Sequence, residues 1–190
     1  MIRCLLLRAA WLILLAAPVA NAVTPADYTA AIKMFRDAPS SQAYFNTAYG
    51  YAVFPRVGKG GWIIGGAFGR GQTYVGSRVT GDTSLSQVSI GFQFGGETFS
   101  EIIFFADKAA YERFTAGKFE FAATAQAVAI TAAAQAQTGT TGSSAGAGVS
   151  KPAAQSEAIY NNGMAVYVHV KVGLMWEASI GGQKFTFEAK

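Results

Sequence analysis

Glycine recurs between short aromatic and β-branched runs from Tyr49 to Phe105, and this pattern most constrains the fold. Residues 89–94 alternate strictly, which places Ile90, Phe92 and Phe94 on one face of an extended strand. Glycine-rich segments between such runs are typical of turns. The pattern therefore predicts a series of strands separated by glycine-rich turns, with a further, buried strand at residues 101–105.

Helix signals flank this region on both sides. Thr24 is a candidate N-cap that precedes Pro25 and Asp27, and an apolar stripe follows at Tyr28 and at the positions four and seven residues later. This helix is expected to end at residue 38, because a residue before proline disfavours helical dihedral angles. A second short helix is expected from residue 40 or 41 to residue 48. Asp107 caps a third over residues 107–115.

The second half of the chain gives weaker signals. Residues 122–137 are rich in alanine, which favours a helix, yet their apolar residues also alternate as in a strand; we take them as mostly strand. Residues 138–156 have the composition of a flexible loop. Strands follow at residues 164–172, at residues 175–180 and through Phe185 and Phe187. Three segments, at residues 70–74, 95–99 and 181–185, share a glycine-then-aromatic pattern that predicts a hairpin turn and an outgoing strand.

Together these signals predict an α+β fold, in which N-terminal helices precede a glycine-rich antiparallel β-sheet curled into a barrel or a sandwich. Glycine within strands permits the tight curvature that such a sheet needs. One domain is expected over residues 23–190, because a domain of ~100–200 residues is the norm.

Residues 1–22 have the three-part pattern of a secretory signal peptide. Arg3 and Arg8 form a basic start, an apolar run extends from Ala9 to Ala17, and Ala20 and Ala22 form a small-x-small cleavage site. Export to the periplasm or peripheral association with the envelope is therefore expected. Cleavage after Ala22 removes Cys4 and two of the 15 Lys and Arg, so the net charge falls from +4 to +2 against 11 acidic residues.

The chain shows few residues suited to catalysis or to metal binding. His169 is the only histidine, so neither a metal cluster nor a nucleophile–histidine pair has a clear candidate, and no nucleophile elbow or phosphate-binding glycine motif is present. We therefore expect a non-enzymatic protein without cofactor or metal. The alternative, a hydrolase that uses Glu101 or Glu177 in a cleft, stays open at this point.

Positive charge is concentrated in one part of the chain. No acidic residue lies between Asp37 and Asp82, whereas Arg56, Lys59, Arg70 and Arg78 do, interleaved with Phe54, Trp62 and Phe68. Cations beside aromatic rings suit an anionic membrane surface, where phosphates meet the cations and the rings lie at headgroup level. Such charges can also merely keep hairpin turns soluble. Nucleic acid is a poorer partner, because the net charge of the exported chain is low.

Several glycine-aromatic blocks resemble the SYLF domain, which is also described as the actin-binding domain of a yeast endocytic protein. The opening blocks are GYAVFPRVGKGG at residues 50–61 and GGAFGRG at residues 65–71. The second block is SIGFQFGG with SEIIFF, at residues 89–96 and 100–105, and the closing block is KVGLMWEASIGG at residues 171–182. The resemblance covers nearly all of the chain from Tyr28 to Phe187.

The resemblance implies a non-enzymatic domain that binds anionic phospholipid, with actin binding in fungal members. Its motifs contain the basic residues Arg56, Lys59 and Arg70, with Trp62 beside them, and its N-terminal helix implies further lipid contacts through Lys33 and Arg36. Export makes actin an unsuitable partner here. The alternative from another class is an envelope structural or self-assembling protein, since exposed strand edges can pair between chains.

Overall fold

The structure is a computed structural model that describes residues 22–61, 64–90, 95–117, 119–121, 128–130, 160–172 and 181–190. Its helices are α1 (Pro25–Asp37), α2 (Pro39–Gln42), α3 (Tyr44–Thr47) and α4 (Lys108–Thr115). Its strands are β1 (Gly50–Gly61), β2 (Ile64–Val75), β3 (Arg78–Ile90), β4 (Gly95–Phe105), β5 (Phe119–Glu120), β6 (Val128–Ile130), β7 (Met164–Val172) and β8 (Gln183–Ala189). The leader predicted at residues 1–22 lies outside the described residues except for Ala22.

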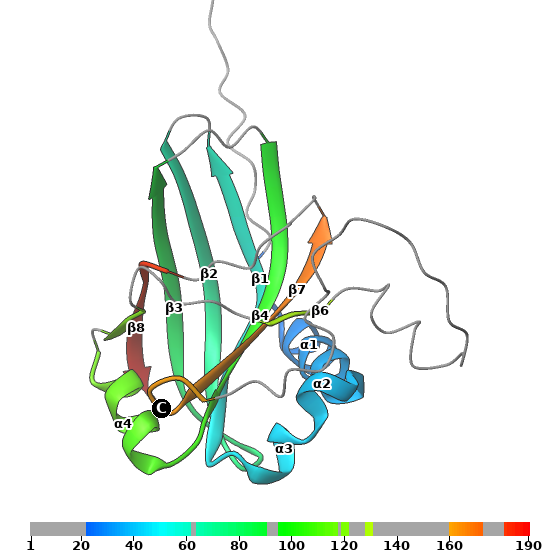
Figure 1. The fold of residues 1–190 in the computed structure, drawn as a ribbon, viewed down its shortest axis with the longest axis vertical. Coiled ribbons are helices and arrows are strands. Elements are labelled where there is room, and N and C mark those ends of the chain that lie inside the picture. Colours follow the sequence, from blue (N-terminus) through cyan, green and yellow to red (C-terminus); the bar gives the residue numbers. More distant parts are fainter. Residues whose placement is uncertain are drawn as a thin grey trace, which may run out of the picture.

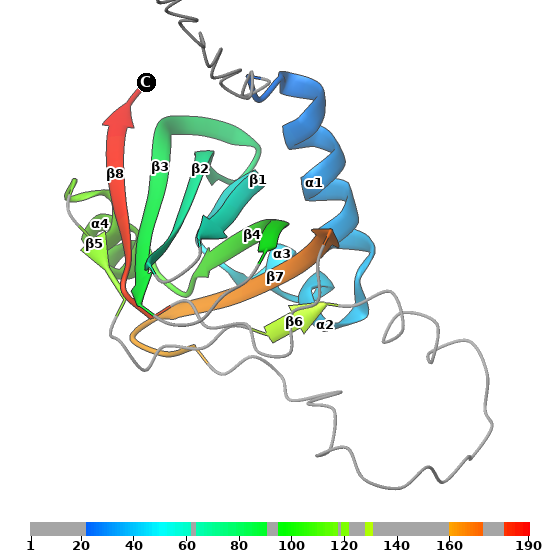
Figure 2. The same ribbon diagram turned by 90° about the horizontal axis from the view of Figure 1, so that it is seen from above.

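The described strands form one curled sheet in the order β5-β8-β3-β2-β1-β4-β7-β6. Every neighbouring pair is antiparallel except β6 and β7, which are parallel. Seen from above, the sheet bends from β8 round to β7 (Figure 2). The prediction of an α+β fold with a curled, mainly antiparallel sheet is confirmed.

Helices cover both faces of this sheet, as Figures 1 and 2 show. On one face, which we call the α1 face, α1 to α3 pack on a core that includes Phe35, Tyr51 and Tyr167. On the other, which we call the α4 face, α4 packs on a core that includes Phe54 and Phe185. Because both faces of β1 and β4 are buried over part of their length, these strands contain the uninterrupted apolar runs seen in the sequence.

Helix α1 begins and ends where its sequence signals place it. The Asp27 amide donates to Thr24 Oγ1 at 3.3 Å and the Thr24 amide donates to Asp27 Oδ2 at 2.8 Å, which completes a capping box. Pro25 occupies the first turn, and the helix ends at Asp37 before Pro39. Tyr28 and Phe35 of the predicted stripe are buried. Helix α1 is thus fixed against the sheet.

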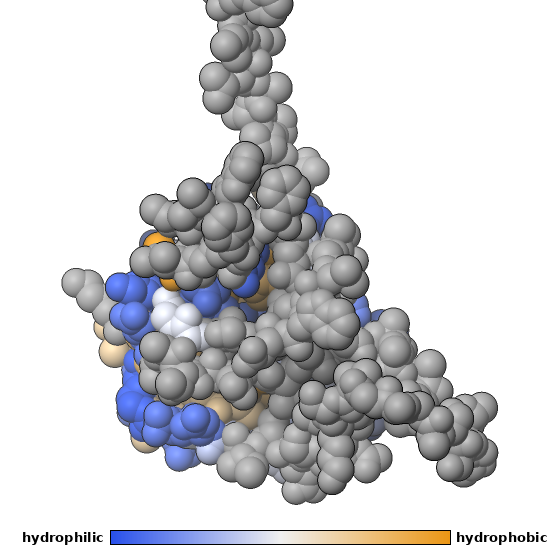
Figure 3. Space-filling view, turned by 45° about the horizontal axis from the view of Figure 1, so that its top comes forward, coloured by the Kyte–Doolittle hydropathy of each residue, from blue (hydrophilic) through white to orange (hydrophobic). Residues whose placement is uncertain are grey.

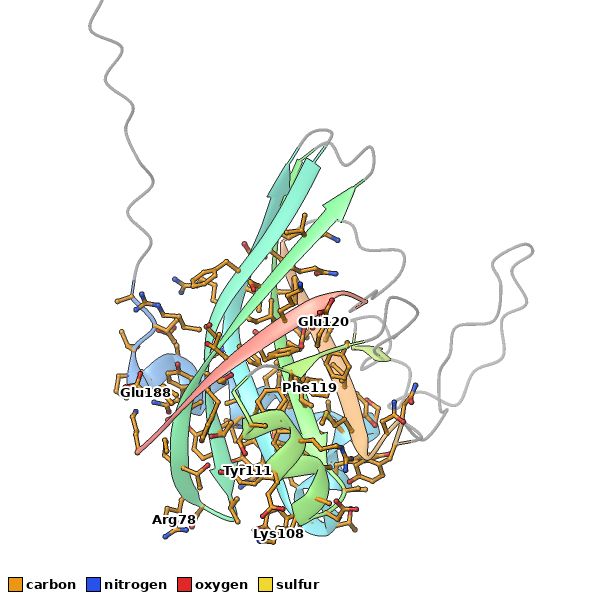
Figure 4. All side chains as sticks on the ribbon, turned by 90° about the vertical axis from the view of Figure 1, so that its left-hand side faces the viewer. Arg78, Lys108, Tyr111, Phe119, Glu120 and Glu188 are labelled. Atoms are coloured by element: carbon orange, nitrogen blue, oxygen red, sulfur yellow. The ribbon has the colours of Figure 1, made fainter. Side chains whose placement is uncertain are left out.

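Helix α4 and the short strand β5 close the α4 face. The Ala110 amide donates to the Asp107 carboxylate at 2.7 Å, so Asp107 caps the helix as predicted. Figure 4 shows Tyr111 on α4 and Phe119 on β5, in front of the sheet. The ring of Phe119 lies 6.1 Å from that of Phe185 on β8.

Two of the three predicted hairpin turns are wrong. Gly71 lies inside β2, and Gly95 and Gly96 begin β4, where they pair with Gly61 and Gly60 of β1. A Cβ at Gly71 would lie 2.6 Å from the Phe54 ring, so glycine here permits a close approach of that ring instead of a turn. Only the third, at Gly181 and Gly182, is a turn, with a φ of +73° at Gly182.

Other boundaries also differ from prediction. The expected helix at residues 40–48 is two short helices, α2 and α3, separated at Ala43. Of the strand expected over residues 89–94, residues 89 and 90 lie in β3, and residues 91–94 lie outside the described part. Of residues 122–137 only 128–130 are described, and they form strand β6. The predicted loop at residues 138–156 and the strand at residues 175–180 lie outside the described residues.

Candidate functional site

The α1 face carries side chains in rows that cross β1, β2, β3 and β8, because directly paired residues of antiparallel strands point to the same face. The rows are set by the strand registers. From the end of the sheet at Gly61 downward, the rows are Gly60–Gly66–Val88, Gly58–Phe68–Ser86–Lys184, Arg56–Arg70–Ser84–Thr186 and Gln72–Asp82–Glu188. The first two rows contain the exposed apolar residues Val88 and Phe68, with Lys184 at the β8 end of the second, and we call them the apolar rows. The row of Arg56 and Arg70 follows along the strands, and then the row of Asp82 and Glu188, which we call the acid row.

The apolar rows are exposed. Phe68 is 56% exposed and Val88 is 74% exposed, and they are the large hydrophobic residues that stand out to solvent in the described part of the chain. The neighbouring Gly58 and Gly60 have open space where a side chain would begin. In the space-filling view, apolar areas at this end border hydrophilic surface (Figure 3). Adjacent exposed hydrophobic residues mark an interaction site more often than isolated ones do.

The next row contains two arginines in direct opposition. Arg56 on β1 pairs across the strands with Arg70 on β2, and like charges placed so are destabilising. The Arg56 guanidinium lies 3.7 Å from the Asp27 carboxylate of α1. Arg70 is exposed and forms no ion pair within the described residues. An anion bound beside Arg70 would relieve the repulsion.

A β-bulge puts Arg56 on this face. The β1–β2 register shifts between Val53, which faces Gln72, and Arg56, which faces Arg70. Pro55 lies in the bulge, where its missing amide hydrogen costs no ladder bond, and its carbonyl accepts from Ser100 Oγ at 2.7 Å. Simple alternation from Val53 would have turned Arg56 toward the α4 face.

The remaining residues of the predicted site do not join the arginines. Lys59 pairs with the buried Ala67, so it points to the α4 face, opposite to Arg70. On α1, Lys33 forms an ion pair with Asp37. The Arg36 guanidinium lies 4.9 Å from the centre of the Phe45 ring. Trp62 lies outside the described residues.

Below the arginines, a groove of about 950 Å³ separates α1 from β2, β3 and β8. Tyr28 and Ile32 of α1 form one wall, and the strands supply Arg70, Asp82 and Glu188. Asp82 accepts from Lys190 Nζ at 2.7 Å and from Gln72 Nε2 at 3.3 Å. Glu188 lies directly opposite Asp82 and forms no ion pair within the described residues.

The tyrosines of the groove are donors at neutral pH. Burial raises the pKa of Tyr28, the Asp82 carboxylate raises it further, and Arg70 lowers it. Burial, with smaller contributions from Tyr51, Tyr28 and Asp82, raises the pKa of Tyr74 to about 12. The Tyr74 hydroxyl donates to Gln72 Oε1 at 2.9 Å. Neither phenol is therefore suited to act as a general base.

The carboxylates considered for catalysis do not line this groove. Glu101 is fully buried on the α4 face, where Gln183 Nε2 donates to its Oε2 at 3.0 Å. Burial raises the pKa of Glu101 to about 8. Glu177 lies outside the described residues. Among the residues that the structure describes, no three His, Cys, Asp or Glu side chains come together as a metal site would require.

Several residues of the face were not picked out by sequence reasoning. Lys184 and Glu188 come from β8, Lys190 follows it directly, and Asp82 and Val88 come from β3. Their only local signal is the alternation within each strand, which does not say that β8 pairs with β3.

None of the helices that the structure describes has both the length and the apolar composition needed to cross a bilayer.

Comparison with known proteins gives one informative relative. The chain is 32% identical over 165 residues to beta cell expansion factor A of Aeromonas veronii, a match that covers 85% of this chain and 54% of that protein. The chain thus spans about half the length of the curated relative it matches. No family model matches the chain.

Proposed function

We propose that this protein is a non-enzymatic, exported binder of anionic phospholipid surfaces, and that the α1 face at the Gly61 end of the sheet is its membrane-contacting surface. One observation carries the proposal: exposed Phe68 and Val88 share a face with Arg56 and Arg70. The two arginines form a single row, which lies one row below Phe68 and two rows below Val88, counted from the Gly61 end of the sheet. In this orientation the apolar residues reach the acyl boundary and the guanidinium groups meet lipid phosphates.

The sequence supports the same proposal independently. The glycine-aromatic blocks resemble the SYLF domain, whose members bind anionic lipids, and they contain Arg56 and Arg70. Membership in that family is part of the proposal. The name of the relative describes an effect on beta cells and specifies no ligand. The proposal therefore rests on the face itself and on the resemblance.

Charge variants at the two ends of the sheet test this function. Each basic residue near an anionic surface contributes ~1 kcal/mol, so Arg70→Ala should weaken partitioning onto phosphatidylglycerol-containing vesicles by about fivefold. The measurement is co-sedimentation with vesicles of phosphatidylcholine and phosphatidylglycerol at about 0.1 M salt, where the Debye length is ~10 Å. Binding by the unmodified protein should fade as salt is raised to about 0.5 M, because the Debye length there is only a few ångströms.

Arg78→Ala is the matched control, because it removes the same charge at the other end of the sheet. Arg78 is exposed and begins β3 after the β2–β3 turn (Figure 4). Its loss should change partitioning at about 0.1 M salt by less than about twofold. Arg78 lies six residues along β3 from Ser84, the partner of Arg70. That is about 20 Å of strand, beyond the ~10 Å Debye length at this salt. Equal losses in the two variants, or no binding of the unmodified protein to any anionic vesicle, would contradict the proposal.

A further inference from the structure

The groove beside α1 has two ends of opposite charge. Its charged lining residues are Arg70, Asp82, Glu188 and Lys190. Two cations and two acids give a formal sum of zero, but the charges are not mixed evenly. Arg70 stands at the end nearest the apolar rows, whereas Asp82 and Glu188 share the next row with only Lys190 beside them. A ligand that is neutral overall but separates its charges complements such a surface.

The spacing of the two ends follows from the register. Arg70 pairs with Ser84, and Asp82 lies two residues from Ser84 on the same face. Diagonal neighbours of this kind have Cα atoms about 7–8 Å apart. The side chains that converge from these positions can hold two opposite charges only a few bonds apart. A phosphate and an ammonium joined by a two-carbon link have this form.

Hydroxyl groups line the space between the ends. Ser84 and Thr186 pair across β3 and β8, with their hydroxyl oxygens 2.6 Å apart, and both border the groove. Tyr28 adds a phenol from α1. Such groups accept or donate hydrogen bonds as a ligand requires, so they suit the phosphate ester and glycerol oxygens between two charged groups.

From these features we propose that the groove binds the phosphoethanolamine headgroup of a zwitterionic phospholipid, with its phosphate at Arg70 and its ammonium at Asp82 and Glu188. The inference rests on the proposed membrane function, because the apolar rows bring headgroups to the mouth of the groove. It goes beyond that function, since attraction to anionic lipid requires no acid row. Glu188 supplies an exposed carboxylate for the ammonium (Figure 4).

A soluble headgroup tests the groove without a membrane. Glycerophosphoethanolamine, titrated into the isotope-labelled protein, should shift backbone amide resonances of α1, β2, β3 and β8 that border the groove. Glycerophosphoglycerol has the phosphate but no ammonium, so it should bind about threefold more weakly. This is the loss of affinity expected when one exposed charge pair is removed. Arg70→Ala should weaken glycerophosphoethanolamine binding by about tenfold, as expected for a charge-assisted hydrogen bond to phosphate.

Glu188→Gln separates the headgroup site from general anion binding. This variant should lose the preference for glycerophosphoethanolamine over glycerophosphoglycerol while it keeps the binding to phosphatidylglycerol vesicles. Absent shifts at the groove, equal affinity for the two headgroups in the unmodified protein, or an unchanged preference in Glu188→Gln would each overturn the headgroup proposal. Vesicle binding that persists in those cases leaves the membrane proposal standing. Loss of vesicle binding with an intact headgroup preference would contradict the membrane proposal alone.

Discussion

Replacing Phe185 by alanine is expected to lower the free energy of unfolding by about 3–5 kcal/mol, the range for truncating a buried phenylalanine. Phe185 is 1% exposed and stands at the centre of the α4-face core. Its ring centroid lies 5.0 Å from that of Phe114 on α4 and 5.6 Å from that of Phe54 on β1. The truncation removes contacts that join β8, α4 and β1 and leaves a cavity, because the structure around such a site relaxes only in part.

The measurement is equilibrium unfolding in urea, followed by circular dichroism. Phe68→Ala is the matched control, because it makes the same chemical change at a position that is 56% exposed. A surface substitution of this kind should lower the free energy of unfolding by less than about 0.5 kcal/mol. Equal losses in the two variants would show that Phe185 does not stand in a packed core.

Replacing Glu101 by glutamine should remove a strong pH dependence of stability. Glu101 is fully buried, and burial raises its pKa from 4.5 to about 8, against a smaller lowering by the Gln183 hydrogen bond. The folded protein therefore keeps the proton at neutral pH, whereas the unfolded chain releases it above pH 4.5. Folding consequently loses stability as pH rises from about 4.5 to 8, by an amount on the order of 3–5 kcal/mol in total.

The protonated form also fits the local hydrogen bonding. Glu101 Oε1 and Gln183 Oε1 are buried without a hydrogen-bond partner among the described residues. Both are acceptors when Glu101 is ionised, whereas a protonated carboxyl supplies a donor. Glutamine at position 101 is always neutral and also supplies donors. It should therefore match the unmodified protein near pH 4.5 and exceed its stability near pH 8.

Urea unfolding at pH 5 and pH 8.5 measures this effect. Glu188→Gln, which removes an exposed carboxylate on β8, should leave the pH dependence of the unmodified protein in place. If Glu101→Gln has the same pH dependence as the unmodified protein, Glu101 is ionised in the fold and its burial is not what sets its pKa.

Local signals predicted the elements that are fixed by neighbours in the sequence. The capping box of Thr24 and Asp27 and the cap at Asp107 require only three or four residues each, so the starts of α1 and α4 were predicted. The alternation of aromatic and β-branched residues predicted the strands for the same reason. These features depend on short-range hydrogen bonds and on side-chain period.

Whether a glycine forms a turn or lies within a strand could not be predicted from sequence, because this depends on contacts with residues distant in the chain. Gly71 was predicted to form a turn, yet it lies within β2 under the ring of Phe54, seventeen residues earlier in the chain. Gly182, in an outwardly similar motif, does form a turn with a positive φ. The two cases differ in what packs against the backbone, which sequence spacing does not reveal.

The candidate site shows the same limit. The local excess of positive charge identified Arg56 and Arg70, but the bulge at Pro55 decides that they share a face and that Lys59 does not. The acid row and Lys184 could not be expected, because they depend on the pairing of β8 with β3 across about one hundred residues. Register and bulges are set by packing over the whole sheet.

A fluorescent label at position 88 tests the proposed membrane face most directly. Val88 is 74% exposed, so Val88→Cys in a Cys4→Ser background accepts an environment-sensitive dye without disturbing the core. Ala109→Cys, at an exposed position on α4, is the control. The proposed face predicts that phosphatidylglycerol vesicles blue-shift the emission of the label at position 88 and leave that at position 109 unchanged. A shift at position 109 alone, or at neither position while the protein sediments with the vesicles, would contradict it.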